Sequence, residues 1–270
     1  MIISDSHLHS RYSADSSEEL KNIARTAVSK GIGIITITDH YDPDFPKDYD
    51  LDFSFDVEEY YQVIRMLKEE YSGQLDIRCG IEAGLMPHLK DEIDALTHKV
   101  PFDLVIGSTH IVNGMDPYYE SFWKDRKPQE AYTEYFSAVE ASIDNISSYD
   151  VYGHLDYIAR YGPEGSFDYK EHADIIDVIL KKLISADKGI EINTAGLRSG
   201  LKETNPSFEV IKRYRELGGD IITMGSDAHS AEFIGYGMDI ARDYLDKAGF
   251  KYYTIFKERK PEFYLLKYIG

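Results

Sequence analysis

The stretch Gly33-Ile34-Ile35-Thr36-Ile37-Thr38, followed directly by Asp39-His40, carries the pattern that decides the fold. Its residues are almost all β-branched or apolar, which is typical of a parallel strand buried on both faces. The strand ends in a carboxylate and an imidazole, two groups with catalytic and metal-binding chemistry. Similar apolar segments, each followed by a helical pattern, recur along the chain.

The other expected strands are also short and apolar. They are residues 1–10, 75–81, 102–107, 149–153, 189–193 and 221–224, with a further strand at 252–256. Helical patterns predict helices at residues 16–30, 57–71, 91–97, 129–144, 172–186, 207–217 and 238–248, and residues 113–128 read as a long polar and aromatic loop. This alternation predicts an α/β fold with a parallel sheet and right-handed crossovers. Because a helix follows nearly every strand, a closed barrel is favoured over an open doubly wound sheet.

The composition is that of one globular domain spanning residues 1–270, with 43% hydrophobic and 13% aromatic residues. The net charge of −18 argues against nucleic acid or an anionic membrane as partner, because no basic stripe is present to neutralise phosphates. A small phosphorylated substrate stays compatible, since bound cations reverse the local potential. The single cysteine, Cys79, reads as a core residue, and the sequence has no leader-like or membrane-spanning segment. We therefore expect a soluble cytoplasmic protein.

The first expected strand ends in a His-x-His pattern. Side chains alternate along a strand, so His7 and His9 point to one face and Leu8 to the other. Two imidazoles on one strand face form a bidentate metal site, and Asp5 on the same face could orient one of them. The alternative is two ordinary histidines near the N-terminus.

Residues able to bind metal follow six different predicted strands. They are His7, His9, His40, Glu82, His110, His154, Asp227 and His229. The carboxyl ends of the strands of a parallel barrel share one face, where active sites are built. Imidazole and carboxylate together suit zinc, iron or manganese, and the lack of thiolates argues against a purely structural zinc site. The pattern predicts a multinuclear metal site.

Glu82 is the only acid at its strand end, and its two oxygens could bridge two ions. Asp227 and His229 repeat the opening pattern of two ligands on one strand face. Asp15 could bind an outer ion or could cap the helix expected to start at residue 16. Asp39 could orient His40 or only close the turn.

Three histidines and two arginines fall outside this pattern. His88, His98 and His172 lie in or beside helices without a partner at ligand spacing, and we expect them on the surface or as caps. Arg160 and Arg198 lie in loops beyond strand ends, where a guanidinium matches the oxygens of a phosphate. The alternative for both arginines is a surface ion pair.

These motifs together resemble the PHP (polymerase and histidinol phosphatase) superfamily over nearly the whole chain. The resemblance is carried by His7-Leu8-His9, Thr38-Asp39-His40, Glu82, Thr109-His110, Gly153-His154-Leu155-Asp156 and Gly225-Ser226-Asp227-Ala228-His229. Within the superfamily, residues 153–160 and 189–198 are most similar to the monofunctional histidinol-phosphate phosphatases of histidine biosynthesis.

The resemblance implies a distorted (β/α)7 TIM-like barrel that holds three divalent ions, which would be zinc, iron or manganese. By matched position, one ion is held by His7, His9, Glu82 and Asp227. Glu82 bridges it to a second ion held by His110 and His154, and a third is held by Asp15, His40 and His229. Some relatives carry histidine at the position of Asp15, so the third ion is where this chain departs from part of the family.

The implied reaction is hydrolysis of the phosphomonoester L-histidinol phosphate. A hydroxide bridging two ions would attack phosphorus while Arg160 and Arg198 neutralise the phosphate oxygens. Asp227 or His229 would supply a proton to the leaving alkoxide. The alternatives are a phosphoesterase of the same superfamily acting on a small nucleotide, a sugar phosphate or phosphotyrosine, and a metal- and phosphate-binding domain without catalysis.

Overall fold

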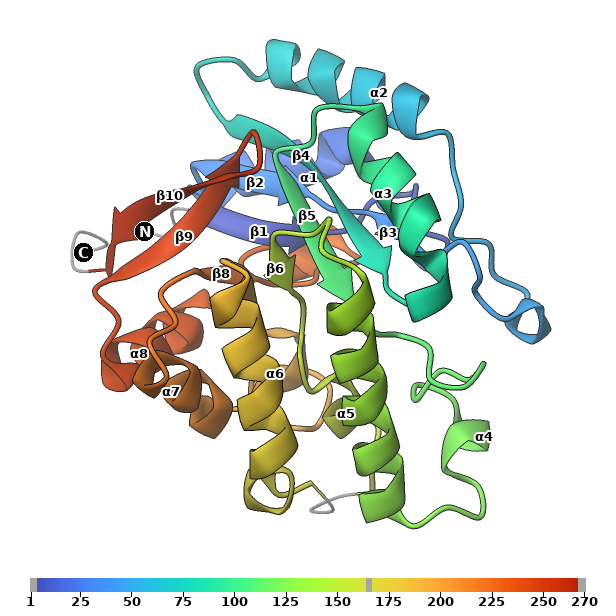
Figure 1. Cartoon of the computed structure of the whole chain (residues 1–270). Helices are drawn as coiled ribbons and strands as arrows, with labels where there is room; N and C mark the ends of the chain where they lie inside the picture. The colour runs from blue at the N-terminus through green and yellow to red at the C-terminus, as the bar shows by residue number, and fades with distance from the viewer. Residues whose placement is uncertain (1–3, 164–166, 267–270) are drawn as a thin grey trace.

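Seven parallel strands form a nearly closed barrel in the computed structural model of the chain, which describes residues 4–163 and 167–266 (Figure 1). In spatial order they are β1 (Ser4–Leu8), β2 (Ile34–Ile37), β4 (Asp76–Gly84), β5 (Leu104–Ser108), β6 (Val151–Tyr152), β7 (Gly189–Asn193) and β8 (Ile222–Gly225). The short β3 (His40–Tyr41) also pairs with β4. Residues 1–3 of the expected first strand lie outside the described residues.

Hydrogen bonds between β1 and the segment after β8 complete the ring. Leu8 forms an isolated parallel bridge with Ala228. The backbone N–H of His9 donates to the Ala228 carbonyl at 3.0 Å, and that of Asp227 donates to the His7 carbonyl at 2.9 Å. The barrel predicted from the alternating pattern is therefore confirmed, and its closure joins two segments that carry candidate ligands.

Helices follow most of the barrel strands and lie outside the ring (Figure 1). They are α1 (Leu20–Ser29), α2 (Val57–Glu70), α3 (Lys90–Lys99), α4 (Glu120–Trp123), α5 (Pro128–Asn145), α6 (Ala173–Ser185), α7 (Phe208–Glu216) and α8 (Met238–Ala248). Asp56 caps α2, because its carboxylate accepts the N–H groups of Glu58 and Glu59 at 3.0 Å.

Two local predictions were wrong. The first helix begins at Leu20 rather than near Ser16, because the Ser16 hydroxyl donates to the His229 carbonyl at 3.0 Å and holds its segment against the barrel rim. The short helix α4 interrupts the expected loop at 113–128. The expected strand at 252–256 is present as β9 (Tyr252–Lys257), which pairs antiparallel with β10 (Lys260–Leu265) outside the barrel.

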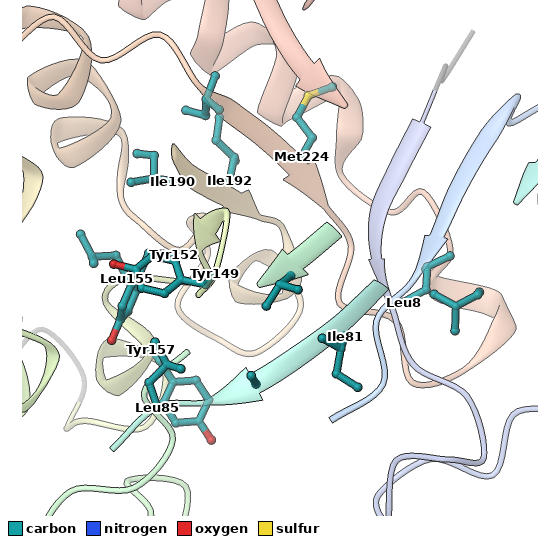
Figure 2. Close-up of a cluster of buried hydrophobic side chains, with 14 of the residues drawn as sticks. Leu8, Ile81, Leu85, Tyr149, Tyr152, Leu155, Tyr157, Ile190, Ile192 and Met224 are labelled. Atoms are coloured by element: carbon teal, nitrogen blue, oxygen red, sulfur yellow. The ribbon is translucent and has the colours of Figure 1, made fainter. Parts of the chain in front are cut away.

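The apolar residues form two separate clusters. The larger one lies between the barrel and its helices, and Leu8, Ile81, Ile192 and Met224 extend into it from their strands (Figure 2). The smaller cluster consists of Leu104, Ile106, Val151 and Phe256, with Ile221 packed against it. Strand alternation turns the β5 and β6 members of this cluster inward, so it fills one end of the ring and leaves the other end to polar residues.

The β9–β10 hairpin covers the amino ends of the barrel strands. Arg78, near the start of β4, donates from Nη1 to the Phe256 carbonyl at 2.6 Å. Asp103, just before β5, accepts the backbone N–H groups of Cys79 and Glu258, both at 3.0 Å. The hairpin thus closes the face opposite to the candidate ligands.

Within the described residues, no helix combines the length and apolar character needed to cross a bilayer.

We predict that Asp103→Asn destabilises the protein without changing the chemistry of the opposite face. The substitution turns one acceptor oxygen into an N–H donor that faces a backbone N–H, which costs about 1–3 kcal/mol of unfolding free energy. Urea unfolding followed by circular dichroism measures this loss. An unchanged denaturation midpoint would show that the hairpin contact contributes nothing to stability.

Candidate metal centre

Glu82 lies at the centre of the candidate ligands and is fully buried. Its Oε2 lies 3.0 Å from Nε2 of His7, 3.5 Å from Nε2 of His9 and 3.0 Å from Nδ1 of His40. Burial alone would raise the pKa of the Glu82 carboxyl, but the neighbouring histidines lower it well below its ordinary value. The carboxylate is therefore charged and faces nitrogen donors.

The other carboxylate oxygen of Glu82 faces a second pair of histidines. Oε1 lies 3.3 Å from Nε2 of His110 and 2.8 Å from Nε2 of His154, and it accepts a hydrogen bond from the Ser108 hydroxyl at 2.7 Å. Each of the two oxygens therefore faces a different group of imidazoles. This is the geometry required of a carboxylate that bridges two ions.

Asp227 adds a second carboxylate to the first group. Its Oδ1 lies 3.1 Å from Nε2 of His9 and 3.8 Å from Nε2 of His7. Asp227 and His154 both have positive φ angles, 54° and 20°. Non-glycine residues rarely adopt this conformation, and it concentrates where the fold must aim a side chain at a site.

Asp15, His40 and His229 form the outer part of the cluster. Nε2 of His229 lies 3.1 Å from Oδ2 of Asp15, and Nε2 of His40 lies 3.9 Å from the same oxygen. The imidazole of His9 stacks against the rings of His40 and His229, with centroids 4.3 and 4.1 Å away, and the centroids of those two rings are 5.6 Å apart. Asp15 does not cap the first helix, whose N-cap position is Glu19.

The donor set fits metal ions. Within residues 4–163 and 167–266, four groups of nitrogen and oxygen atoms lie close enough to share an ion: His7, His9 and Glu82; Glu82, His110 and His154; His9, His40 and His229; and His40, Asp42 and His110. Among the described residues, five buried imidazole nitrogens lack a hydrogen bond of normal geometry: Nε2 of His9, Nδ1 of His40, Nε2 of His110, Nδ1 of His154 and Nε2 of His172. Buried polar atoms are normally paired, and the first three of these nitrogens face carboxylate oxygens of the cluster at 3.0–3.3 Å, which is where a shared cation would satisfy both groups.

Two carboxylates that the sequence analysis missed orient these histidines from behind. Oε1 of Glu191 lies 2.6 Å from Nδ1 of His7, and Oδ1 of Asp42 lies 2.8 Å from Nδ1 of His110. In each histidine the opposite nitrogen faces Glu82. Glu191 could have been recognised from the sequence, because it is the only acid within the apolar strand 189–193. Asp42 could not, because it lies in a loop with many other acids.

Asp5 and Asp39 stabilise backbone segments instead of imidazoles. The Asp5 carboxylate accepts from the Ser226 N–H and hydroxyl, at 2.9 and 2.5 Å, so it holds the end of β8 rather than a histidine ring. Asp39 accepts the N–H and hydroxyl groups of Ser10 and Ser13 at 2.6–3.1 Å. It therefore holds the turn after β1, a role that differs from the two expected from the sequence.

Arg160 and Arg198 both lie on the ligand face. Arg160 is buried, and its Nη1 donates to Oδ2 of Asp227 at 3.0 Å. Arg198 donates from Nη1 and Nη2 to the carbonyls of Ser226 and Asp227, at 2.7 and 2.6 Å. Neither forms the surface ion pair considered as an alternative.

A cavity of about 350 Å³ opens onto the cluster. Its lining includes candidate ligands and Arg160 together with aromatic residues and one further acid: Phe45, Phe53, Tyr118, Tyr119, Tyr157, Tyr161 and Asp116. Tyr157 donates its hydroxyl to Oδ1 of Asp116 at 3.1 Å. Burial raises the pKa of the Asp116 carboxyl to about 6. This acid, which the sequence analysis did not single out, gains its charge as the pH rises through about 6.

The remaining histidines lie away from the cluster. His88 is exposed beside Asp44, and His98 is exposed with its ring nitrogen 2.6 Å from the Asp94 carbonyl. The expectation that His172 is a surface or capping residue was wrong, because its ring is buried against Phe167 and makes no capping bond at the start of α6.

Comparison with known proteins places this geometry in a family. Residues 5–195 match the family described as PHP domain. The histidinol-phosphatase of Lactococcus lactis subsp. lactis is 35% identical over 259 residues, which cover 95% of each chain. A probable histidinol-phosphatase of Clostridium acetobutylicum is 31% identical over 99% of this chain and 100% of its own.

A solved structure agrees with the fold. The crystal structure of the histidinol phosphate phosphatase from Lactococcus lactis, in complex with zinc, L-histidinol and phosphate, matches with a TM-score of 0.89 and 33% identity. The match covers 96% of this chain and 98% of that one. The full-length sequence relatives and the shared barrel agree with the family match. The chain therefore belongs to the PHP domain family.

Proposed function

We propose that this chain is a metal-dependent phosphomonoesterase that hydrolyses L-histidinol phosphate to L-histidinol and phosphate in histidine biosynthesis. One observation carries the proposal: the bridging carboxylate Glu82 and its histidines border a cavity that also contains a buried guanidinium and an acid among tyrosines. Such a cavity offers separate places for a phosphate and for a cationic, aromatic group. The Lactococcus relative, crystallised with L-histidinol and phosphate, supports the same assignment. Residues 1–270 act as a single domain.

Three divalent ions occupy the cluster in this proposal, with zinc, iron and manganese all suited to its nitrogen and oxygen ligands. The first is held by His7, His9, Glu82 and Asp227, the second by Glu82, His110 and His154, and the third by Asp15, His40 and His229. When bound, the ions lower the pKa of coordinated water so that hydroxide can attack phosphorus near neutral pH.

The arginines bind the phosphate oxygens. Arg160 lines the cavity beside Asp227, and Arg198 lines the adjoining hollow with Asp15 and His229. Their fixed bonds to the protein hold the guanidinium planes in place, which lowers the entropy lost on binding an anion. His229, the more exposed of the two candidate acids, is the better placed to protonate the leaving alkoxide, with Asp227 beside it.

The aromatic side of the cavity binds the rest of the substrate. The carboxylate of Asp116 attracts the ammonium or imidazolium group, and the tyrosines contact its apolar parts. The rings of Tyr49 and Tyr119 stack at 3.8 Å, and the Tyr49 hydroxyl accepts the Asp116 N–H at 3.4 Å, so this wall is braced.

Removal of metal should abolish hydrolysis of both L-histidinol phosphate and p-nitrophenyl phosphate. Dialysis against a chelator followed by reloading with zinc or manganese should restore both activities, because the attacking water depends on the ions. His9→Ala should bind less metal and lose activity while its circular dichroism spectrum stays that of a folded barrel. Activity that survives complete chelation would exclude metal-dependent catalysis.

A panel of phosphomonoesters tests the substrate. We expect kcat/KM for L-histidinol phosphate to exceed that for nucleotides, sugar phosphates and phosphotyrosine by more than about 10-fold, the effect of a single well-placed polar contact. Equal activity across the panel would instead indicate a general phosphoesterase, and binding of phosphate without turnover would indicate a non-catalytic domain.

Asp116→Asn should raise KM for L-histidinol phosphate by about 10- to 100-fold, the loss of one charge-assisted hydrogen bond. Phenyl phosphate, which lacks a cationic group, should be little affected. Because the carboxyl pKa is near 6 and the charged form binds, the preference of the wild type should fall as pH drops through about 6. Asp44→Asn, an exposed acid paired with His88, is the matched control. Equal KM for wild type and Asp116→Asn would place the substrate cation elsewhere.

His229→Asn tests the proposed ligand and acid roles together. We expect lower kcat, loss of metal from the outer position and a changed alkaline limb of the pH–rate profile. A substrate with a good leaving group, such as p-nitrophenyl phosphate, should lose less activity because it needs no proton. If turnover falls while metal content and the pH profile stay fixed, neither role applies to His229.

A further inference from the structure

Glu191 joins the metal cluster to the rest of the site without being one of its proposed ligands. It lies in β7, is fully buried, and its Oε1 is 2.6 Å from Nδ1 of His7. The other ring nitrogen of His7, Nε2, faces Glu82 at 3.0 Å. A carboxylate at Nδ1 holds the ring proton there and leaves Nε2 free to bind an ion.

The second oxygen of Glu191 connects two further strands. Oε2 accepts the backbone N–H of His154 at 3.1 Å, where that residue adopts its positive φ. Oε2 also accepts from Nδ2 of Asn193 at 3.1 Å. The same amide nitrogen donates to Oδ2 of Asp227 at 3.2 Å, so one carboxylate and one amide contact residues from three strand ends.

Asn193 extends the connection to the guanidinium proposed to bind phosphate. Its Oδ1 accepts from Nη2 of Arg160 at 2.7 Å and from the Ala195 N–H at 3.0 Å. Arg160 is thereby held through Nη2 by Asn193 and through Nη1 by Asp227. Each polar atom of the Asn193 side chain is used, which fixes the orientation of its amide.

The backbone leaves room for this arrangement. A Cβ atom at Gly225 would lie 2.3 Å from Oε1 of Glu191 and 2.4 Å from Cβ of His7. Only glycine at this position of β8 lets the carboxylate and the imidazole meet. The contact is therefore built by three strands, β1, β7 and β8, and is not a chance approach of two side chains.

We propose that Glu191 and Asn193 are positioning residues that couple the metal centre to the anion-binding arginine. Glu191 sets the tautomer of His7 and makes this histidine a stronger ligand. Asn193 holds the side chains of Asp227 and Arg160 in position relative to each other. The inference deepens the proposed phosphatase function and rests on it. Partners of this kind change metal affinity or activity by about 10- to 100-fold when removed.

Glu191→Gln tests the first half, because the amide has the same shape but no charge. In chelator competition with zinc we expect about 10- to 100-fold weaker binding of one ion. At saturating zinc, the fall in kcat should be larger than the change in KM. Asp103→Asn, which also neutralises a buried acid but at the opposite end of the barrel, should lower stability and leave zinc affinity unchanged. Equal zinc affinity in Glu191→Gln and wild type overturns the proposal, as does an equal loss in Asp103→Asn.

Asn193→Ala tests the second half. Freed from the amide, Arg160 should bind anions less well, so the inhibition constant for inorganic phosphate and KM should rise by about 10-fold, the effect of one lost charge-assisted hydrogen bond. Zinc affinity should change much less than in Glu191→Gln. An unchanged inhibition constant for phosphate would overturn the link to Arg160.

A measurement on the zinc-loaded wild type does not depend on whether the variants fold. Nitrogen-15 NMR of labelled histidines should show a proton on Nδ1 of His7, and an Nδ1 without a proton overturns the role of Glu191. Both the zinc affinity and the His7 tautomer are measured in the absence of substrate. If L-histidinol phosphate were not hydrolysed, the proposed function would fail while these two results could still stand.

Discussion

The structure depends on the burial of the Glu82 carboxylate at the carboxyl end of the barrel. A buried carboxylate without partners would neutralise itself or unfold its surroundings, so the fold must supply positive or proton-bearing groups around it. It does so with imidazoles from several strand ends, which approach both oxygens within 3.5 Å. Closure of the ring between β1 and β8 is what brings His7 and Asp227 to the same place.

The division of the barrel into an apolar and a polar end follows from this constraint. Phe256 and the small cluster around it fill the end covered by the hairpin, while Glu82, Glu191 and their partners occupy the other. Because dispersion and hydrophobic burial stabilise the first end, the second can keep charged groups at modest net cost. Stability and chemistry are thus located at opposite ends of one barrel, as is general for barrels of this type.

The sequence predicted the barrel and the meeting of the strand-end histidines because both follow from local patterns. Six of the seven barrel strands end in a polar motif that is readable on its own, and the parallel arrangement puts these ends together. The contact between Glu191 and His7 joins residues 184 positions apart, so no local pattern reveals it. The start of α1 was misplaced for a similar reason, since Ser16 bonds to a residue beyond β8. The strand β10, with Lys260, Pro261 and Glu262, has little strand character and forms through its pairing with β9.

The carboxylates around the site also link metal binding to protonation. Burial by itself lowers the pKa of His7, but Glu191 and Glu82 raise it well above its ordinary value. In His9, burial and the neighbouring His229 and His40 lower the pKa instead. The carboxylates thus favour a proton at His7, whereas the surroundings of His9 disfavour one. Metal affinity in such a cluster rises with pH, and the groups that hold the proton in the free protein are the same groups that hold the cation when it binds.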